Sequence, residues 1–392
     1  MKPISESIYD AKGNIHHLTQ QIGTDGQGAL YLTSNGGVIL RMSPERESDC
    51  QRYDDAKLLP LSHIDNICMP IEYLQKPHIG YLITLPEDFV PLRTLVDVTK
   101  GQTPTDFYTR SGGTKWRLHL LADLAKTLHN LHALPVMYGS MSLDRVFIPP
   151  KTINPTIRLL YSVKMDCSMT FQEEHDEDPY TAPESGQGQT SLLSDSYAFS
   201  ALAYDVLTLS KELEKVITPE FKAIFTQAAE PTPTLRPKMI NFYRAFLQQL
   251  DMLVTCKKCR LDFLYAPACP FCQDSPPKVL KAVIYDQVEQ TRIDRGLKVF
   301  EFAIMQHFFW NYHTDNILLH DSIEKSIESA ISISADKKLT LMLKNLMDKD
   351  IFVNDIHLEP GQETNIALPC ERILVSFKLY SSVTRYIDMV IA

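Results

Sequence analysis

The pattern of apolar positions changes twice along the 392-residue chain. Residues 1–86 contain short apolar runs, GALYLT, GGVILRM and GYLITL, separated by turns that carry Gly and Asn, which predicts β-strands. In residues 115–250 the apolar positions recur three and four residues apart, as in RLHLLADLAKTLHNLHA, which predicts helices with one buried face. From Lys278 onward the period falls to two, as in LTLML at 339–343, which predicts antiparallel strands.

These changes place the chain in the α+β class and divide it into four expected domains. We expect a β-rich lobe at 1–86, a helical lobe at 87–250, a cysteine-rich knuckle at 251–276 and an antiparallel β-sandwich at 277–392.

The charge of the chain narrows the range of partners. Lys and Arg number 39 against 48 Asp and Glu, a formal net charge of −9. Binding to nucleic acid or to an anionic membrane depends on a surplus of cations, so we expect neither. The N-terminus MKPISESIYDAKGN has no apolar core of signal-peptide type, and no apolar stretch reaches the ~18 residues that span a bilayer. We therefore expect a cytoplasmic protein.

The cysteines fall into two groups. The segment CKKCRLDFLYAPACPFC holds two C-x-x-C pairs nine residues apart, formed by Cys256, Cys259, Cys269 and Cys272. Four thiolates at such spacing are typical of tetrahedral zinc, and a site filled by four protein ligands is structural because no place remains for water. A redox dithiol would need only one pair. The remaining cysteines are scattered and expected to be reduced thiols: Cys50, Cys68, Cys167 and Cys370.

Near the N-terminus, a glycine-rich run suggests a nucleotide site. IGTDGQGALY at 22–31 contains Gly23, Gly26 and Gly28, and missing side chains let backbone N–H groups approach phosphates. Taken alone, such a run is more often a hairpin turn. Further along, the strand VILRM carries Arg41, a second candidate for phosphate contact.

Three motifs in the helical region identify a related family. YTAPES contains Glu184, LLSDSYAFSALAYDVL contains Asp195, and EPTPTLRP contains Arg236. Over residues 20–275 the chain resembles bacterial eukaryotic-like Ser/Thr protein kinases. The ending CPFC resembles those kinases with a C-terminal zinc motif that accompany von Willebrand factor A and metal-dependent phosphatase proteins in tellurite-resistance-associated phosphorylation triads. The resemblance implies a bilobal fold in which Arg236 pairs with Glu184.

The same resemblance locates the chemical positions, and this chain departs from them. Ser140 stands where a kinase holds its catalytic Asp, Arg145 at the Asn that binds magnesium, and Tyr161 at the Asp of D-F-G. A serine hydroxyl is a poor base near neutral pH, and a guanidinium repels magnesium, which requires oxygen ligands. We therefore predict that the chain has no catalytic residues.

The glycine-rich run also departs from the kinase pattern. Asp25 replaces its middle glycine, and Arg41 replaces a lysine whose acidic partner on the next helix would be Asp54 or Asp55.

These observations lead us to expect a pseudokinase-like regulatory scaffold in bacterial signalling or stress response. The resemblance suggests von Willebrand factor A-type or phosphatase proteins as partners. An atypical active Ser/Thr kinase that uses Arg41 with Asp144 or Asp166 stays open, as does an adaptor with no nucleotide site. We expect structural zinc, and leave open ATP binding without a firm magnesium site.

Overall fold

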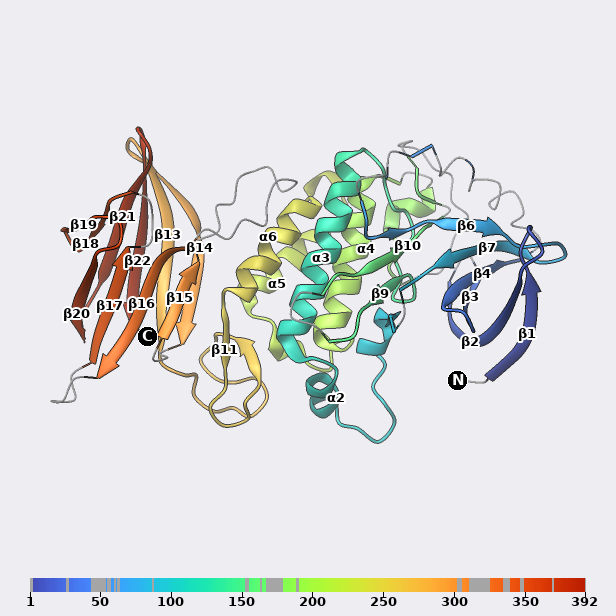
Figure 1. Cartoon of the computed structure of the whole chain (residues 1–392), viewed down its shortest axis with the longest axis horizontal. Coiled ribbons are helices and arrows are strands. Elements are labelled where there is room, and N and C mark those ends of the chain that lie inside the picture. Colours follow the sequence, from blue (N-terminus) through green and yellow to red (C-terminus); the bar gives the residue numbers. More distant parts are fainter. Residues whose placement is uncertain are drawn as a thin grey trace. The chain divides into compact units, whose positions relative to one another are not determined.

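The computed structural model describes residues 3–25, 28–43, 54, 58–59, 61, 64–86, 88–151, 155–162, 164–166, 179–187, 190–301, 305–309, 325–333, 339–345, 349–368 and 370–391. Two compact units make up the chain, Met1–Leu247 and Gln248–Ala392, and each contains β-sheets (Figure 1). Because long helices accompany these sheets, the predicted α+β class is confirmed. No helix among the described residues is long and apolar enough to cross a membrane.

The first unit begins with a six-stranded antiparallel sheet that closes on itself, here called the barrel. Its strand order is β1-β2-β3-β4-β7-β6, and a bridge between Asp10 and Leu74 joins the ends of the outer strands. Ala11 N also donates to Tyr73 O at 2.9 Å. The interior is apolar and is filled by Ile8, Leu18, Tyr31, Ile39, Leu74 and Leu82. The strands are β1 (Pro3–Tyr9), β2 (Ile15–Asp25), β3 (Gly28–Thr33), β4 (Gly37–Met42), β6 (Pro70–Tyr73) and β7 (Ile79–Thr84).

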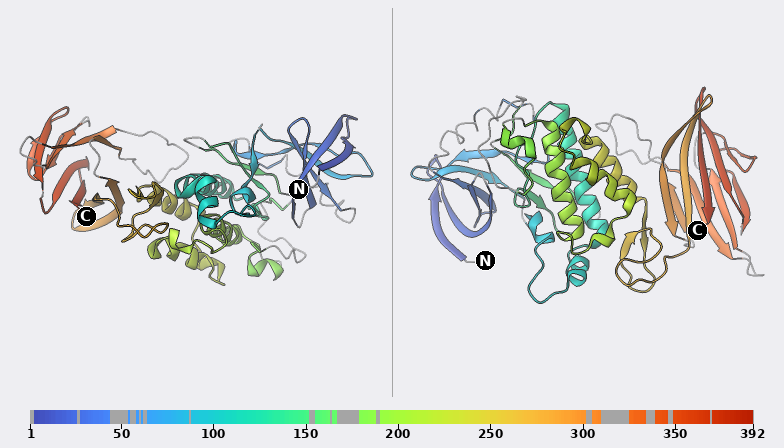
Figure 2. Two further views of the ribbon diagram at one scale, coloured as in Figure 1. Left: turned by 90° about the horizontal axis from the view of Figure 1, so that it is seen from below. Right: turned by 180° about the vertical axis from the view of Figure 1, so that it is seen from behind.

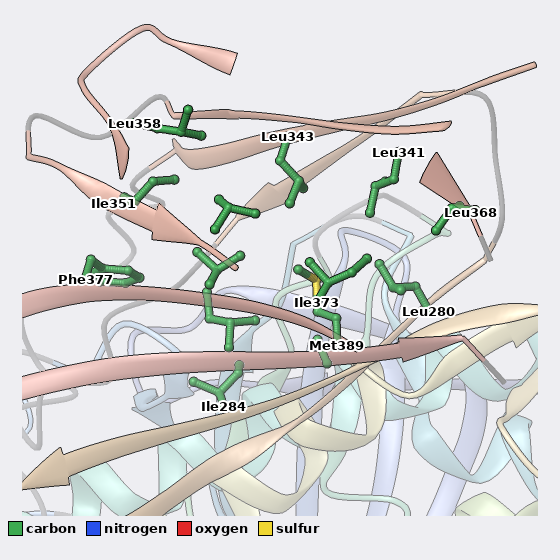
Figure 3. Packing of buried hydrophobic residues seen from close by; sticks show 14 residues of the cluster. Leu280, Ile284, Leu341, Leu343, Ile351, Leu358, Leu368, Ile373, Phe377 and Met389 are labelled. Carbon is green, nitrogen blue, oxygen red and sulfur yellow. The ribbon is translucent and has the colours of Figure 1, made fainter. Parts of the chain in front are cut away.

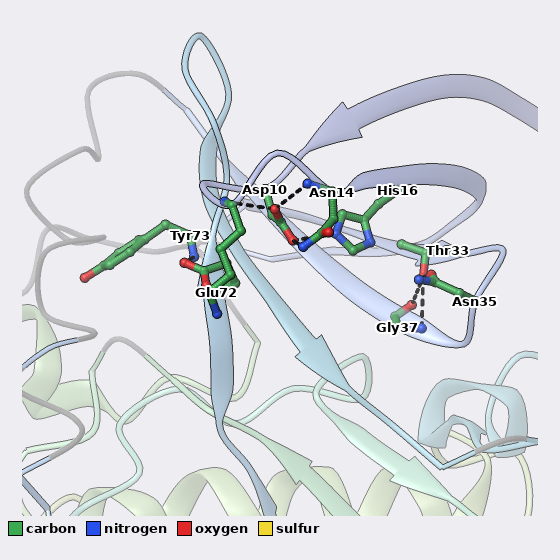
Figure 4. Close-up of polar contacts among 9 residues, drawn as sticks. Asp10, Asn14, His16, Thr33, Asn35, Gly37, Glu72 and Tyr73 are labelled. Atoms are coloured by element: carbon green, nitrogen blue, oxygen red, sulfur yellow. Dashed lines mark hydrogen bonds and ion pairs between the residues drawn. The ribbon is translucent and has the colours of Figure 1, made fainter.

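A polar cluster holds the turn between β1 and β2 at this closure (Figure 4). Buried Asp10 accepts hydrogen bonds from the backbone and side chain of Asn14 and from His16 Nε2 at 2.8–3.0 Å. Burial alone would raise the pKa of Asp10, but these hydrogen bonds outweigh it and lower the pKa to about 2. Lys12, in the same turn, forms an ion pair with Glu72 of β6 at 2.5 Å. The turn is therefore fixed to the strand that closes the barrel.

The first unit also contains α-helices. The predicted apolar face of α3 is confirmed, since Leu118, Leu121, Leu124, Leu128 and Leu131 are all buried. This helix packs beside α4 (Figures 1 and 2). The helices are α2 (Pro104–Arg110), α3 (Gly113–Ala133), α4 (Leu192–Thr208), α5 (Pro219–Ala228) and α6 (Met239–Leu250). Shorter 3-10 turns are η2 (Leu92–Leu95), η3 (Pro183–Gln187), η4 (Glu214–Val216) and η5 (Pro233–Leu235).

Three helix starts follow from local sequence. Thr103 and Thr218 cap α2 and α5, and each is followed by a proline at the first helical position, where the missing N–H has no partner to lose. Ser191 begins α4 in a capping box with Ser194. The hydroxyls satisfy backbone donors that would otherwise stay without partners at each helix start.

A small four-stranded sheet is formed by short strands that lie before and after helices α2 and α3 in the chain. Its strand order is β5-β10-β9-β8, and β5 runs parallel to β10. The strands are β5 (Ile67–Cys68), β8 (Val90–Pro91), β9 (Val146–Ile148) and β10 (Arg158–Leu160). This sheet places the segments that flank residues 139–145 and 161–162 next to each other.

Arg117 connects three elements of the first unit from inside its core. The fully buried guanidinium donates to Leu95 O at 2.8 Å, to Val206 O at 2.9 Å and to Ser111 Oγ at 2.8 Å. Burial lowers the pKa of Arg117 to about 10. It holds the ends of η2, α2 and α4 around α3.

The second unit contains two antiparallel sheets that share one apolar core (Figure 3). One has the order β14-β13-β22-β21-β18-β19 and the other β15-β16-β17-β20. Buried Ile373, Val375 and Phe377 alternate along β21 with more exposed residues, as their period of two predicted. The strands are β13 (Val279–Val288), β14 (Thr291–Glu301), β15 (Met305–Phe309), β16 (Lys325–Ile333), β17 (Leu339–Asn345), β18 (Ile351–Val353), β19 (Ile356–Leu358), β20 (Glu363–Leu368), β21 (Ile373–Tyr380) and β22 (Val383–Ile391).

Candidate functional site

The four predicted metal ligands come together in the second unit. Cys256 and Cys259 lie in the turn of a two-stranded hairpin, between β11 (Leu253–Thr255) and β12 (Asp262–Leu264), and Cys269 and Cys272 follow β12. The sulfur atoms of Cys256, Cys259, Cys269 and Cys272 all lie within 4.8 Å of one another. Two of the sulfur pairs are 3.5 Å and 3.6 Å apart. Disulfides would need about 2.05 Å, whereas the edge of a zinc tetrathiolate tetrahedron is about 3.8 Å. The four thiols therefore fit a metal ion such as zinc.

The two halves of the cluster repeat one backbone conformation. Arg260 N donates to Cys256 O and Gln273 N donates to Cys269 O, both at 2.9 Å. Arg260 and Gln273 each have a positive φ, at 62° and 60°. Such a turn directs backbone N–H groups toward the first cysteine. Burial raises the pKa of Cys256, but the N–H groups of Cys259 and Lys258 help to lower it to about 7.

The surroundings of the cluster indicate a structural role. Cys256 and Cys269 are buried, and the cluster shares an apolar core with Phe263, Val279 and Val299. A divalent ion with four thiolates carries a net charge of −2. The exposed side chains of Lys257, Lys258 and Arg260 place positive charge beside it. A bound metal would therefore join the turn of the hairpin to the segment 269–272, and the apolar core around it includes Val279 of β13 and Val299 of β14.

In the first unit, the predicted pairing of Arg236 with Glu184 is confirmed. Arg236 Nη1 and Nη2 donate to the two carboxylate oxygens of Glu184 at 2.6 Å and 2.8 Å, and both residues are buried. Ser194 Oγ donates to the same carboxylate at 2.7 Å. The pair joins η3 to the segment before α6. Burial would raise the pKa of Glu184, but the hydrogen bonds from Arg236 and Ser194 lower it overall.

Asp195, near the start of α4, fixes the loop that contains Ser140. Its carboxylate accepts hydrogen bonds from Tyr138 N at 2.7 Å, from Gly139 N at 2.9 Å and from His132 Nε2 at 2.9 Å. The loop therefore reaches Ser140 in one defined conformation. Beside Ser140 lies a cavity of about 30 Å³ that Asp195 and Thr190 also line. Thr190 Oγ1 is buried there without a hydrogen-bond partner among the described residues.

The other two predicted chemical positions contact each other. Arg145 Nη1 donates to Tyr161 O at 2.9 Å, and both side chains are almost completely buried. The ring of Tyr161 meets that of Tyr81, on β7, edge to face with their centroids 5.8 Å apart. Tyr161 thus packs against strand β7 of the barrel, and Arg145 binds its backbone carbonyl.

The predicted nucleotide residues lie on three strands of the barrel, apart from Gly26, which lies outside the described residues together with Asp55, Cys50 and Cys167. Gly28 packs so closely on β4 that a Cβ would lie 2.4 Å from Arg41 O. Gly23, on β2, packs in the same way on Asp144. Both glycines are therefore required by close packing within this structure.

Arg41 has an acidic partner that the sequence did not indicate. Its Nη1 donates to both carboxylate oxygens of Glu6, on β1, at 2.9 Å, and its Nη2 donates to Tyr31 Oη at 2.8 Å. The kinase resemblance predicts Asp54 or Asp55 as the partner instead. Glu6 is 35 positions from Arg41, and only the pairing of the strands brings the two together.

Comparison with known proteins gives no relative, since the chain matches no protein-family model and no curated protein.

Proposed function

We propose that the chain is a kinase-like regulatory scaffold that lacks phosphotransfer activity and acts in bacterial signalling by binding other proteins. The observation that carries the proposal is the hydrogen bond from Arg145 to Tyr161 O. In the proposed kinase register, these are the two positions that would supply magnesium ligands. A buried guanidinium occupies them instead, and its charge opposes that of a divalent cation.

One feature of the chain order and two contacts support the kinase-like bilobal fold within this proposal. The barrel precedes the helices in the chain, Asp195 binds the backbone just before Ser140, and Glu184 pairs with Arg236. All three features stabilise the fold, whereas Ser140, Arg145 and Tyr161 occupy the positions of catalytic and magnesium-binding residues in kinases. A sequence kept for its shape and not for turnover would retain this combination.

Ser140 is unsuited to the role of the catalytic Asp. It lies beside a cavity of about 30 Å³, which holds no more than a few water molecules. Its hydroxyl offers no carboxylate to accept the proton of a substrate.

The alternative of an active kinase would require Asp144 or Asp166 as a carboxylate at the reaction centre. Asp144 is buried against Arg93, with both oxygens hydrogen bonded. Asp166 belongs to an isolated bridge with Met137.

The alternative of an adaptor with no nucleotide site is favoured by the burial of Tyr161 against Tyr81 of the barrel. We propose structural zinc at the four cysteines, and von Willebrand factor A-type or phosphatase proteins as the first partners to test.

Phosphotransfer assays test the proposal directly. The purified full chain is incubated with labelled ATP, magnesium or manganese, and a general protein substrate, beside the Arg41→Ala variant. We expect equal background labelling of both. Autophosphorylation or substrate labelling that disappears in Arg41→Ala would refute the scaffold proposal.

A further inference from the structure

Strand β2 of the barrel rests directly on the carboxylate of Asp144. A Cβ built on Gly23 would lie 2.5 Å from Asp144 Cγ and 2.8 Å from Asp144 Oδ2. Only a residue without a side chain leaves room for this contact. The pairing of β2 with β3 is irregular between Gln21 and Gly23, so the strand changes register where it meets Asp144.

Asp144 is held in this place by Arg93, on η2. Arg93 Nε donates to Asp144 Oδ1 at 2.7 Å and Arg93 Nη2 donates to Asp144 Oδ2 at 2.6 Å, a bidentate pair. The backbone of Arg93 also donates to Leu143 O at 3.1 Å. The Asp144 side chain is only 2% exposed, whereas that of Arg93 is 41% exposed. The buried negative charge of Asp144 is therefore balanced by Arg93, whose side chain reaches it from the surface.

We propose that Gly23, Asp144 and Arg93 form a latch that holds β2 on the loop 139–145 and keeps the cleft of the first unit closed to nucleotides. The latch rests on the proposed function, because only a kinase-like fold would admit a nucleotide between these elements. The latch explains Gly23 by its close packing on Asp144 and not by phosphate binding. The carboxylate lies against the α-carbon of Gly23, and its negative charge would repel a phosphate at that position.

Hydrogen–deuterium exchange of the full chain, without nucleotide, tests the latch. In Arg93→Ala the amides of residues 18–25 should exchange at least ~10-fold faster than in the parent chain, since local opening of β2 sets their rate. Arg372→Ala is the matched control. Arg372 forms the same bidentate pair with Asp388 at 2.6 Å and 2.7 Å, but in the second unit. The control should leave exchange at residues 18–25 unchanged.

A second variant separates the latch from the effect of an unpaired buried charge. Arg93→Ala/Asp144→Asn removes the ion pair but leaves no buried carboxylate, so it should fold. Its β2 amides should still exchange faster than those of the parent chain. Unchanged exchange at residues 18–25 in this folded double variant would overturn the latch.

Titration of the parent chain with ATP in EDTA gives the complementary result. A closed cleft predicts no change in melting temperature, and a saturable increase would overturn the latch. Neither outcome depends on phosphotransfer. An active chain would refute the scaffold proposal, whereas the exchange result would still decide whether β2 is held by Asp144.

Discussion

Replacing Gly23 with alanine perturbs the contact between β2 and Asp144 by one methyl group. The new Cβ would lie 2.5 Å from Asp144 Cγ, about 1 Å closer than ordinary carbon contacts of roughly 3.5–4.0 Å. Asp144 is unable to move aside freely because Arg93 binds both of its oxygens. Overpacking of a fixed contact costs about 1–3 kcal/mol. In a unit of this size, each kcal/mol lowers the melting temperature by roughly 2–4 °C.

Differential scanning calorimetry of the full chain measures this effect. Gly23→Ala should lower the transition of the first unit by about 2–12 °C. Gly37→Ala is the control in the same barrel. Its methyl would meet Leu82 Cδ1 at 2.9 Å and Thr33 Oγ1 at 3.1 Å, and neither of these atoms is held by an ion pair as Asp144 is. A shift in Gly23→Ala no larger than that in Gly37→Ala would refute the reasoning that Asp144 is rigidly held.

Three further predictions concern other parts of the molecule. Removal of metal by a chelator, or Cys256→Ser, should release one zinc ion per chain and loosen the packing of the second unit near its four cysteines. Zinc analysis would measure the release, and near-UV circular dichroism would measure the packing. A zinc-free parent chain with unchanged spectra would contradict a structural metal. Glu184→Gln should destabilise the first unit by about 3–5 kcal/mol because Arg236 loses its buried counter-ion; a calorimetric shift within error of the parent chain would contradict that loss. Asp10→Asn should alter the acid dependence of stability. Since the pKa of Asp10 falls to about 2 on folding, its ionisation stabilises the folded chain above its unfolded pKa of about 4, and this contribution is lost as the pH falls toward 2. Acid denaturation curves that keep the same slope in Asp10→Asn would oppose this assignment.

Sequence reasoning succeeded where a feature depends on residues close together in the chain. The four cysteines are ordered by two short knuckles, so their spacing alone predicted that they would meet. The leucines of α3 follow the helical period, and their burial follows from it. Glu184 and Arg236 are far apart, but each lies within a motif that fixed its place.

The ion pairs of Arg41 and Arg93 had no such signal. Glu6 and Arg41 lie 35 positions apart, and Arg93 and Asp144 lie 51 positions apart. Many acids and bases in this chain could form such pairs equally well. Which of them meet depends on the barrel closing and on η2 lying beside the loop 139–145. The tertiary structure determines which residues pair, and no short sequence pattern predicts these pairs.

The most direct test of the account is a titration of the zinc-loaded chain with manganese and ADP, followed by the electron paramagnetic resonance signal of free manganese. If Arg145 and Tyr161 fill the metal positions, the signal stays that of a protein-free mixture throughout the titration. Saturable loss of the signal that depends on the nucleotide and disappears in Tyr161→Ala would contradict the account.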